Sequence, residues 1–291
     1  KDAVIVFAQK RLNQNIIERD REGSFSREIW RECAEFGIQG LPFPEKYGGN
    51  NADILTTMLT MEGLGYGCRD NGLIFGINAQ MWSVQMPILT FGTEQQKEKY
   101  LPPLCRGELI GAHGMSEPDS GSDAFSLRTR AERRDGGYVL NGTKTFVTNA
   151  PICDLALVFA TIDPARKMLG VTGFLVEKGT PGFSVSKHID KMGLRTSPMA
   201  EVILEDCFVP EENRLGKEGI GSRIFSDSME WERSCILGSH LGAMQRLLER
   251  CVQHANDRVQ FGDHIGKFQS VANRIVDMKL RLETARLLLY K

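Results

Sequence analysis

The 291-residue sequence lacks several features that would assign it at once to a class of protein. Its 36 basic and 37 acidic residues nearly cancel, which leaves no bulk attraction to nucleic acid or anionic lipid, so we expect no nucleic-acid partner. No hydrophobic run approaches the 18 residues of a membrane-spanning helix, since the longest clean stretch is residues 155–160. No secretory signal pattern and no internal repeat is found. With 41% hydrophobic residues, the composition predicts a globular protein without a membrane span.

Cysteine and histidine patterns are also uninformative for metal chemistry. Seven cysteines form no Cys-x-x-Cys pair, and no two of the five histidines have metal-ligand spacing, so we expect no metal. The cysteines stand among apolar neighbours and are expected to be buried, reduced thiols. This favours a reducing compartment, either the bacterial cytoplasm or the mitochondrial matrix. The glycines of residues 216–221 lack the Gly-x-Gly-x-x-Gly spacing of a Rossmann dinucleotide site.

Hydrophobic periodicity divides the chain into three blocks and predicts an α+β multidomain protein. Residues 1–110 show helical spacing and are expected to form an N-terminal helical domain. Residues 111–217 contain strand-like runs separated by Gly and Pro, which predict an antiparallel, barrel-like β domain. Residues 218–291 return to helical spacing and predict a C-terminal helical bundle. Because this last pattern is still periodic at residue 291, we expect the bundle to be truncated in this sequence.

Local signals predict individual boundaries within these blocks. Ser26 is a candidate N-cap, and Thr93-Glu94-Gln95-Gln96 fits a capping box at the start of another helix. Pro102 and Pro103 are expected to end that helix. The Asn141-Gly142 pair, between strand-like residues, predicts a β-hairpin turn.

Three short segments carry groups that suit a phosphorylated, planar cofactor. Residues 115–123, Met-Ser-Glu-Pro-Asp-Ser-Gly-Ser-Asp, could approach a phosphate or sugar edge, but they also suit a polar turn. Residues 144–149, Lys-Thr-Phe-Val-Thr-Asn, could stack a planar ring or simply pack across strands. Residues 257–262, Asp-Arg-Val-Gln-Phe-Gly, could bind a pyrophosphate or form a solvated helix end. Each segment is ambiguous by itself.

Taken together in order, these segments resemble the acyl-CoA dehydrogenase family. The resemblance runs over nearly the whole chain, and it depends on six pieces that follow the family's order and spacing. The six pieces are residues 101–104 with 107–109, 116–123, 141–144 with 147–149, 192–197, 208–210 and 258–262. The resemblance implies FAD bound between the β domain and the C-terminal helices, and a homodimer or homotetramer in which one subunit completes its neighbour's site.

The resemblance also implies roles for particular residues. Met115 and Ser116 would lie at the flavin ring, Gly121 and Ser122 would approach the cofactor, and Ser122 would also contact the substrate arm. Phe146 and Thr148 would cover and hydrogen-bond the isoalloxazine, while Arg258, Phe261 and Gln269 would reach the FAD of the neighbouring subunit. Two residues depart from the common pattern: Phe146 stands where many members have Trp, and Asp119 where many have Gly.

The catalytic base is expected to be Glu232. In the isovaleryl-type branch of the family, the base is a Glu directly before an Arg on the first long helix of the C-terminal domain, which matches Glu232 and Arg233. Helical geometry independently places Glu232 on one face with Phe225, Met229 and Ile236, where desolvation would raise its pKa toward a general base's range. A buried structural ion pair is the alternative role. Glu230 and Arg233 are candidate contacts of the pantetheine arm.

The resemblance implies an FAD-dependent oxidoreductase that dehydrogenates an acyl thioester between Cα and Cβ. The family's base removes the α proton, and hydride leaves the β carbon for flavin N5. An acyl-CoA is the favoured substrate, and an acyl or aminoacyl group on a carrier protein is the first alternative. A flavin-binding relative that uses oxygen, or one that is not catalytic, remains open. An electron-transfer flavoprotein is the expected electron acceptor.

Overall fold

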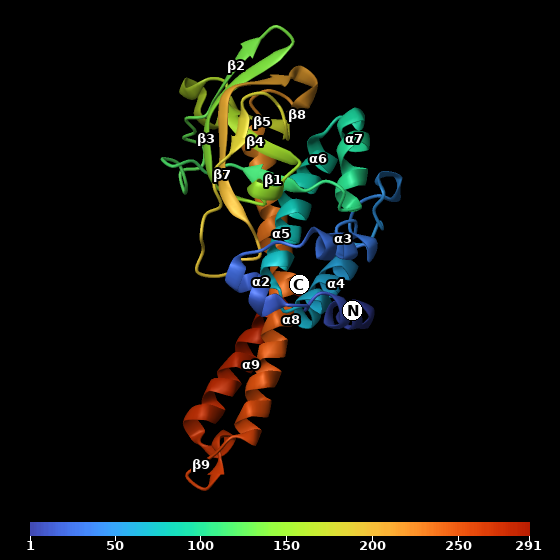
Figure 1. The fold of residues 1–291 in the computed structure, drawn as a ribbon, viewed down its shortest axis with the longest axis vertical. Coiled ribbons are helices and arrows are strands. Elements are labelled where there is room, and N and C mark those ends of the chain that lie inside the picture. The colour runs from blue at the N-terminus through green and yellow to red at the C-terminus, as the bar shows by residue number, and fades with distance from the viewer.

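A computed structural model describes residues 1–291 as a helical region, a β region and a long helical hairpin (Figure 1). The predicted order of helices, strands and helices is therefore confirmed. One hydrophobic core joins the N-terminal helices to one face of the sheet and to the start of the long hairpin. A second core lies within the β region. None of the helices combines the length and the hydrophobicity that a membrane span requires.

The N-terminal region contains most of the helices. They are α1 (Asp2–Arg11), α2 (Ile16–Glu22), α3 (Arg27–Glu35), α4 (Ile54–Gly67), α5 (Asn71–Gln80), a π-helical turn (Met81–Gln85), α6 (Met86–Phe91) and α7 (Glu94–Cys105). The Ser26 cap is confirmed, because its hydroxyl accepts a hydrogen bond from the Ile29 amide at 3.2 Å. The capping box is confirmed too, with Thr93 and Gln96 bonded reciprocally at 3.0 and 3.2 Å.

The prediction that two prolines end α7 is wrong. Pro102 and Pro103 lie inside the last turn, and the helix continues to Cys105. Proline removes a donor but keeps its carbonyl, and these carbonyls accept hydrogen bonds from the amides of Arg106 and Glu108 at 3.1 and 2.9 Å. The carbonyls of both prolines therefore have hydrogen-bond donors, and the last turn of α7 remains helical.

The β region forms one mixed sheet. Its strands are β1 (Gly111–Gly114), β2 (Arg130–Arg134), β3 (Gly137–Thr148), β4 (Leu155–Thr161), β5 (Val171–Glu177), β6 (Phe183–Val185), β7 (Met199–Pro210) and β8 (Arg214–Leu215). They follow the order β6-β7-β3-β2-β4-β5-β8, with β1 beside β4. Most pairs are antiparallel as predicted, but β1 and a short part of β2 run parallel to β4. The long connection from β1 to β4 makes this parallel pairing possible.

The predicted hairpin at Asn141-Gly142 is wrong. These residues lie inside the continuous strand β3, where the pairing with β7 shifts register. Gly142 has φ +148°, and a Cβ there would meet Thr129 at 2.5 Å, so glycine allows the close approach. The Asn141 side chain bonds the Asp206 amide of β7 at 2.8 Å instead of turning the chain. The actual two-residue turn, between β2 and β3, is Asp135-Gly136.

The C-terminal region is a hairpin of two long helices. They are α8 (Gly221–Asp257) and α9 (Gln269–Tyr290), and the short strands β9 (Val259–Gln260) and β10 (Asp263–His264) lie at its tip (Figure 1). Other short helical turns are Glu45–Tyr47, Ala150–Ile152, Pro164–Gly170, Glu211–Asn213 and Ile265–Lys267. All seven cysteines are free, and six are buried as expected. The expectation is wrong for Cys251, which is exposed because this part of α8 projects away from the body.

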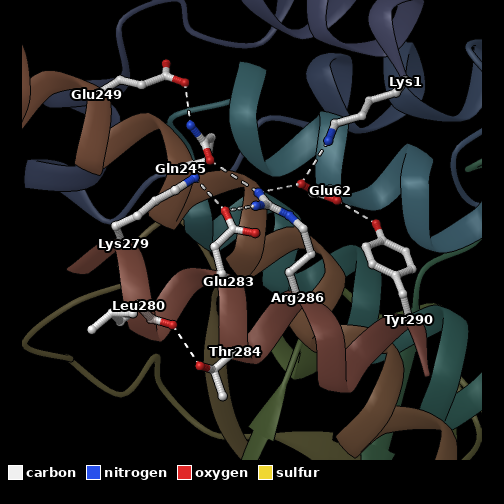
Figure 2. A network of polar contacts seen from close by, with 10 residues as sticks. All are labelled: Lys1, Glu62, Gln245, Glu249, Lys279, Leu280, Glu283, Thr284, Arg286 and Tyr290. Atoms are coloured by element: carbon white, nitrogen blue, oxygen red, sulfur yellow. Dashed lines mark hydrogen bonds and ion pairs between the residues drawn. The ribbon is translucent and has the colours of Figure 1, made fainter. Parts of the chain in front are cut away.

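A buried carboxylate joins the N-terminal helices to this hairpin. Figure 2 shows Glu62 of α4 between Lys1, Arg286 and Tyr290. Glu62 is 1% exposed, and it accepts from Lys1 Nζ at 2.8 Å, from Arg286 at 3.1 Å and from the Tyr290 hydroxyl at 2.5 Å. Burial acts to raise the pKa of Glu62, but these three partners outweigh it and lower the pKa. The ionised carboxylate therefore holds the end of α9 against α4.

Replacing Glu62 by Gln should lower the free energy of unfolding by about 1–2 kcal/mol at pH 7, because a neutral amide no longer offsets the positive charges of Lys1 and Arg286. A carboxyl whose pKa is depressed by folding stabilises above its unfolded pKa and loses that stabilisation as the pH falls. The difference between the two proteins should therefore narrow below about pH 4. Urea titrations at several pH values would measure it. Glu283→Gln, a more exposed change in the same network, is the control, and a pH-independent difference would contradict the assignment.

Candidate active site

A cleft of about 220 Å³ lies between the sheet, α5 and α8. The residues that line it come from α5 and the π-helical turn, β1 and its end, β3, and α8. They are Phe75, Ala79, Ser83, His113, Met115, Ser116, Thr145, Phe146, Thr148, Phe225, Met229 and Glu232. Five residues predicted from the sequence thus meet in one cavity, namely Met115, Ser116, Phe146, Thr148 and Glu232.

Glu232 is the only carboxylate among these residues. The predicted helix face is confirmed for Phe225 and Met229, which line the cleft with Glu232, whereas Ile236 is not among the lining residues. Burial raises the pKa of Glu232, while the Ser83 hydroxyl and the Arg233 charge act to lower it. The net direction is upward. A desolvated carboxylate with a raised pKa, held in a cavity, has the properties of a general base.

Phe146 is held in an unusual backbone conformation beside the cleft. Its φ is +55°, and the pairing of β3 with β7 is irregular between Lys144 and Val147. This bulge turns the Phe146 side chain outward, so that it is 64% exposed despite its position in a strand. Strained backbone of this kind persists where the surrounding structure fixes it, and often serves function. The exposed ring and the neighbouring hydroxyl of Thr148 form an open, amphipathic wall.

A buried ion pair fixes the adjacent part of the cleft wall. Lys144 Nζ lies 2.7 Å from a Glu117 carboxylate oxygen and donates to the Met115 carbonyl at 3.2 Å. Burial lowers the pKa of Lys144 to about 8, and the Lys144 charge keeps the pKa of Glu117 low despite burial, so both are ionised at neutral pH. The Thr145 amide also donates to the Ser116 carbonyl at 2.9 Å. These contacts hold Met115 and Ser116 at the end of β1 against β3.

Asn149 ties α5 to the same corner of the sheet. Its buried side chain donates to the carbonyls of Gly76 on α5 and Gly111 on β1, at 3.0 and 3.1 Å. A Cβ at Gly76 would lie 2.9 Å from the Asn149 amide oxygen, so glycine permits this approach. The contact sets the position of the helix that carries Phe75 and Ala79.

The other predicted site residues lie outside the cleft. Gly121 and Ser122 are exposed in the loop after β1, and Glu230 and Arg233 are exposed on α8. Arg258, Phe261 and Gln269 lie at the far end of the hairpin, where Phe261 is 96% exposed. At 1.5 Å per residue, Arg258 is about 39 Å along α8 from Glu232. Those three residues therefore cannot contact the cleft of their own chain, and their roles stay predictions.

Two polar cleft residues had no signal in the sequence. Ser83 lies in the π-helical turn, which breaks helical periodicity, and it is 2% exposed. His113 of β1 stacks on Phe225 with ring centroids 5.8 Å apart, and its Nε2 is buried without a partner. Burial lowers the pKa of His113 to about 4, so the ring is neutral. Both residues reach the cleft through tertiary contacts that no local pattern encodes.

Comparison with known proteins assigns the chain to a family. Residues 1–108, 112–207 and 219–291 match the N-terminal, middle and C-terminal domains of acyl-CoA dehydrogenases. The chain belongs to the acyl-CoA dehydrogenase family. Like other members of that family, it has an N-terminal helical domain, a middle β domain and a C-terminal helical domain.

The similar members include enzymes that act on carrier-bound substrates. An L-prolyl-[peptidyl-carrier protein] dehydrogenase of Serratia sp. is 44% identical over 284 residues, which cover 98% of this chain and 72% of that protein. The crystal structure of the prolyl acyl carrier protein oxidase AnaB has a TM-score of 0.98 and 54% identity, over 99% of this chain and 76% of that one. A structure of PigA with FAD and proline has a TM-score of 0.97 and 42% identity, over the same shares.

The cleft of this acyl-CoA dehydrogenase family member fits the flavin of FAD. Phe146 presents an exposed aromatic ring for stacking, and the Ser116 and Thr148 side chains line the same cavity with hydroxyls that suit the polar edge of a flavin. Glu232 faces this position from α8. Met115, Ser116, Phe146 and Thr148 are therefore the residues of this chain that would hold the flavin ring.

Proposed function

We propose that this protein is an FAD-dependent dehydrogenase that oxidises the Cα–Cβ bond of an acyl thioester, with Glu232 as its base. The observation that carries this proposal is the position of Glu232, a partly buried carboxylate in the cleft that also contains Phe146, Ser116 and Thr148. Family membership supports the same reaction.

Each group of cleft residues would have its own role in the reaction. Glu232 would take the α proton onto its carboxylate, aided by a pKa that burial raises above its ordinary value. Ser116 and Thr148 would orient the cofactor by hydrogen bonds, and Phe146 would cover it. The apolar side chains of Phe75, Phe225 and Met229 would exclude water from the acyl group. FAD, when bound, supplies the hydride acceptor.

The acyl group is proposed to be L-prolyl on a peptidyl-carrier protein. The support is the identity of 44–54% with prolyl-carrier dehydrogenases and with AnaB. Phe75 lines both the cleft and a separate cavity of about 90 Å³, and we propose that its ring limits the space for the acyl group. Ser122, Glu230 and Arg233 are proposed to contact the pantetheine arm, which both CoA and carrier proteins have in common.

The assembly and the electron acceptor are part of the proposal. We propose a homodimer or homotetramer in which Arg258, Phe261 and Gln269 reach the FAD bound by a neighbouring subunit. Their distance from the cleft of their own chain supports this arrangement. An electron-transfer flavoprotein is the proposed electron acceptor. Oxygen is a second candidate, because AnaB is described as an oxidase. Six buried, unpaired thiols support a reducing compartment.

A panel of thioesters offered to the full-length, flavin-loaded protein would test the function. L-prolyl loaded on a carrier protein should bleach the flavin at least tenfold faster than L-prolyl-CoA, isovaleryl-CoA or L-alanyl carrier protein. The measurement is anaerobic stopped-flow absorbance, followed by exposure to air, in which rapid reoxidation would favour oxygen as acceptor. Faster reduction by isovaleryl-CoA would make the protein an acyl-CoA dehydrogenase, and no bleaching by any thioester would refute dehydrogenation.

A further inference from the structure

A π-helical turn faces the proposed base. Residues Met81–Gln85 interrupt the helix between α5 and α6, and all five are buried. A π turn inserts one residue into the helical repeat, which re-aims the side chains that follow, and such turns frequently occur at functional sites. Here the turn carries Ser83 into the cleft that contains Glu232.

Two stacked tryptophans fix this turn against α8. The rings of Trp82 and Trp231 lie nearly parallel at 7°, with centroids 6.0 Å apart. The Trp82 indole N–H donates to the Asn78 side-chain oxygen at 2.9 Å, which holds the ring in place. Ser83 follows one of these tryptophans and Glu232 follows the other. The stack therefore packs this turn against α8, and both following residues line the same cleft.

The Ser83 hydroxyl acts to lower the pKa of Glu232, and it is the group with this effect that also lines the cleft. This hydroxyl favours the ionised carboxylate, and so it opposes the burial that raises the pKa. Arg233 acts in the same direction by its charge alone, and its side chain is exposed.

We propose that Ser83 is a positioning residue, whose hydroxyl donates to the Glu232 carboxylate and aims it into the cleft. The proposal rests on the proposed role of Glu232 as the base. A serine that merely fills space in the π turn would affect folding or binding, but it would not affect the ionisation of the base.

Ser83→Ala in the full-length, flavin-loaded protein tests this difference. The substitution removes a donor to the ionised form, so the pKa of Glu232 should rise, and the base should remain protonated to higher pH. The acid limb of the pH profile for flavin reduction should move up by about one unit, which is a tenfold loss of rate below that limb. Above the limb the rate should change little, and KM should be unchanged.

Matched variants keep the test specific. Ser228→Ala removes another buried hydroxyl of the same region, one that donates to the Phe225 carbonyl at 2.8 Å, and it should leave the pH profile in place. Ser83→Cys, nearly the same size but a weaker donor, should shift the profile less than Ala and covers the case in which Ser83→Ala does not fold. Flavin content and the melting temperature report folding.

The outcomes separate this inference from the proposed function. An unshifted acid limb in Ser83→Ala or Ser83→Cys, with Glu232→Gln inactive, would overturn the positioning role alone. Full activity of Glu232→Gln would instead overturn the proposed base, and with it both proposals. A shifted limb in Ser83→Ala, reduced in Ser83→Cys and absent in Ser228→Ala, would support the positioning role.

Discussion

Replacing Glu232 by Gln is expected to reduce turnover by about 10²–10⁴-fold, the usual contribution of a general base, while the protein keeps its flavin. Gln has nearly the same shape but cannot accept the α proton, so flavin and substrate should still bind. In the unmodified protein, the rate should fall as the pH drops through the raised pKa of Glu232, because the protonated carboxyl is not a base. Stopped-flow reduction of the bound flavin across a pH series would measure both effects.

The control for this change is Glu249→Gln. Glu249 lies on the same helix but hydrogen-bonds the Tyr66 hydroxyl at 2.6 Å on the exposed surface. Its substitution should leave the rate of flavin reduction and its pH profile unchanged. If Glu232→Gln kept its turnover, another group would have to remove the proton, and the cleft described here holds no second carboxylate.

The base could be predicted from the sequence because its surroundings are partly local. Glu232, Met229 and Phe225 lie three and seven residues apart on one helix, so helical periodicity alone places them on one face. Ser83 could not be found in this way, since a π turn breaks the period and Glu232 is 149 residues away in the chain. The ion pair of Glu117 and Lys144 could not be predicted from the sequence either, because it forms only where the end of β1 packs against β3.

The wrong prediction of a hairpin turn at Asn141-Gly142 also arises because tertiary contacts decide the structure. Asn141-Gly142 and Asp135-Gly136 are both good turn dipeptides, and local preference cannot choose between them. The choice is made by pairing with β7, in which the Asn141 side chain bonds the backbone of Asp206. The domain boundaries near residues 110 and 217, and the roles of residues outside the cleft, stay predictions because they depend on partners beyond the single chain.

Gly242→Ala is expected to lower the free energy of unfolding by about 3 kcal/mol or more, because it overpacks the contact between α4 and α8. A Cβ at Gly242 would lie 1.9 Å from the Glu62 carbonyl oxygen and 2.5 Å from the Tyr66 amide nitrogen. Both are backbone atoms of α4, so neither can rotate away as a side chain would. Nearby, a Cβ at Gly65 would meet the Ser239 carbonyl oxygen at 1.8 Å, which shows that the helices touch backbone to backbone.

The same substitution should also affect the cleft. Relief of the clash requires α8 to move away from α4, and α8 carries Glu232, so the surviving folded protein should reduce its flavin more slowly. Urea unfolding and stopped-flow reduction would measure the two effects. Gly193→Ala is the control, because a Cβ there meets nothing within 4 Å, and it should alter neither quantity. Unchanged stability of Gly242→Ala would mean that α4 and α8 are not in backbone contact, and the position assigned to Glu232 would lose its support.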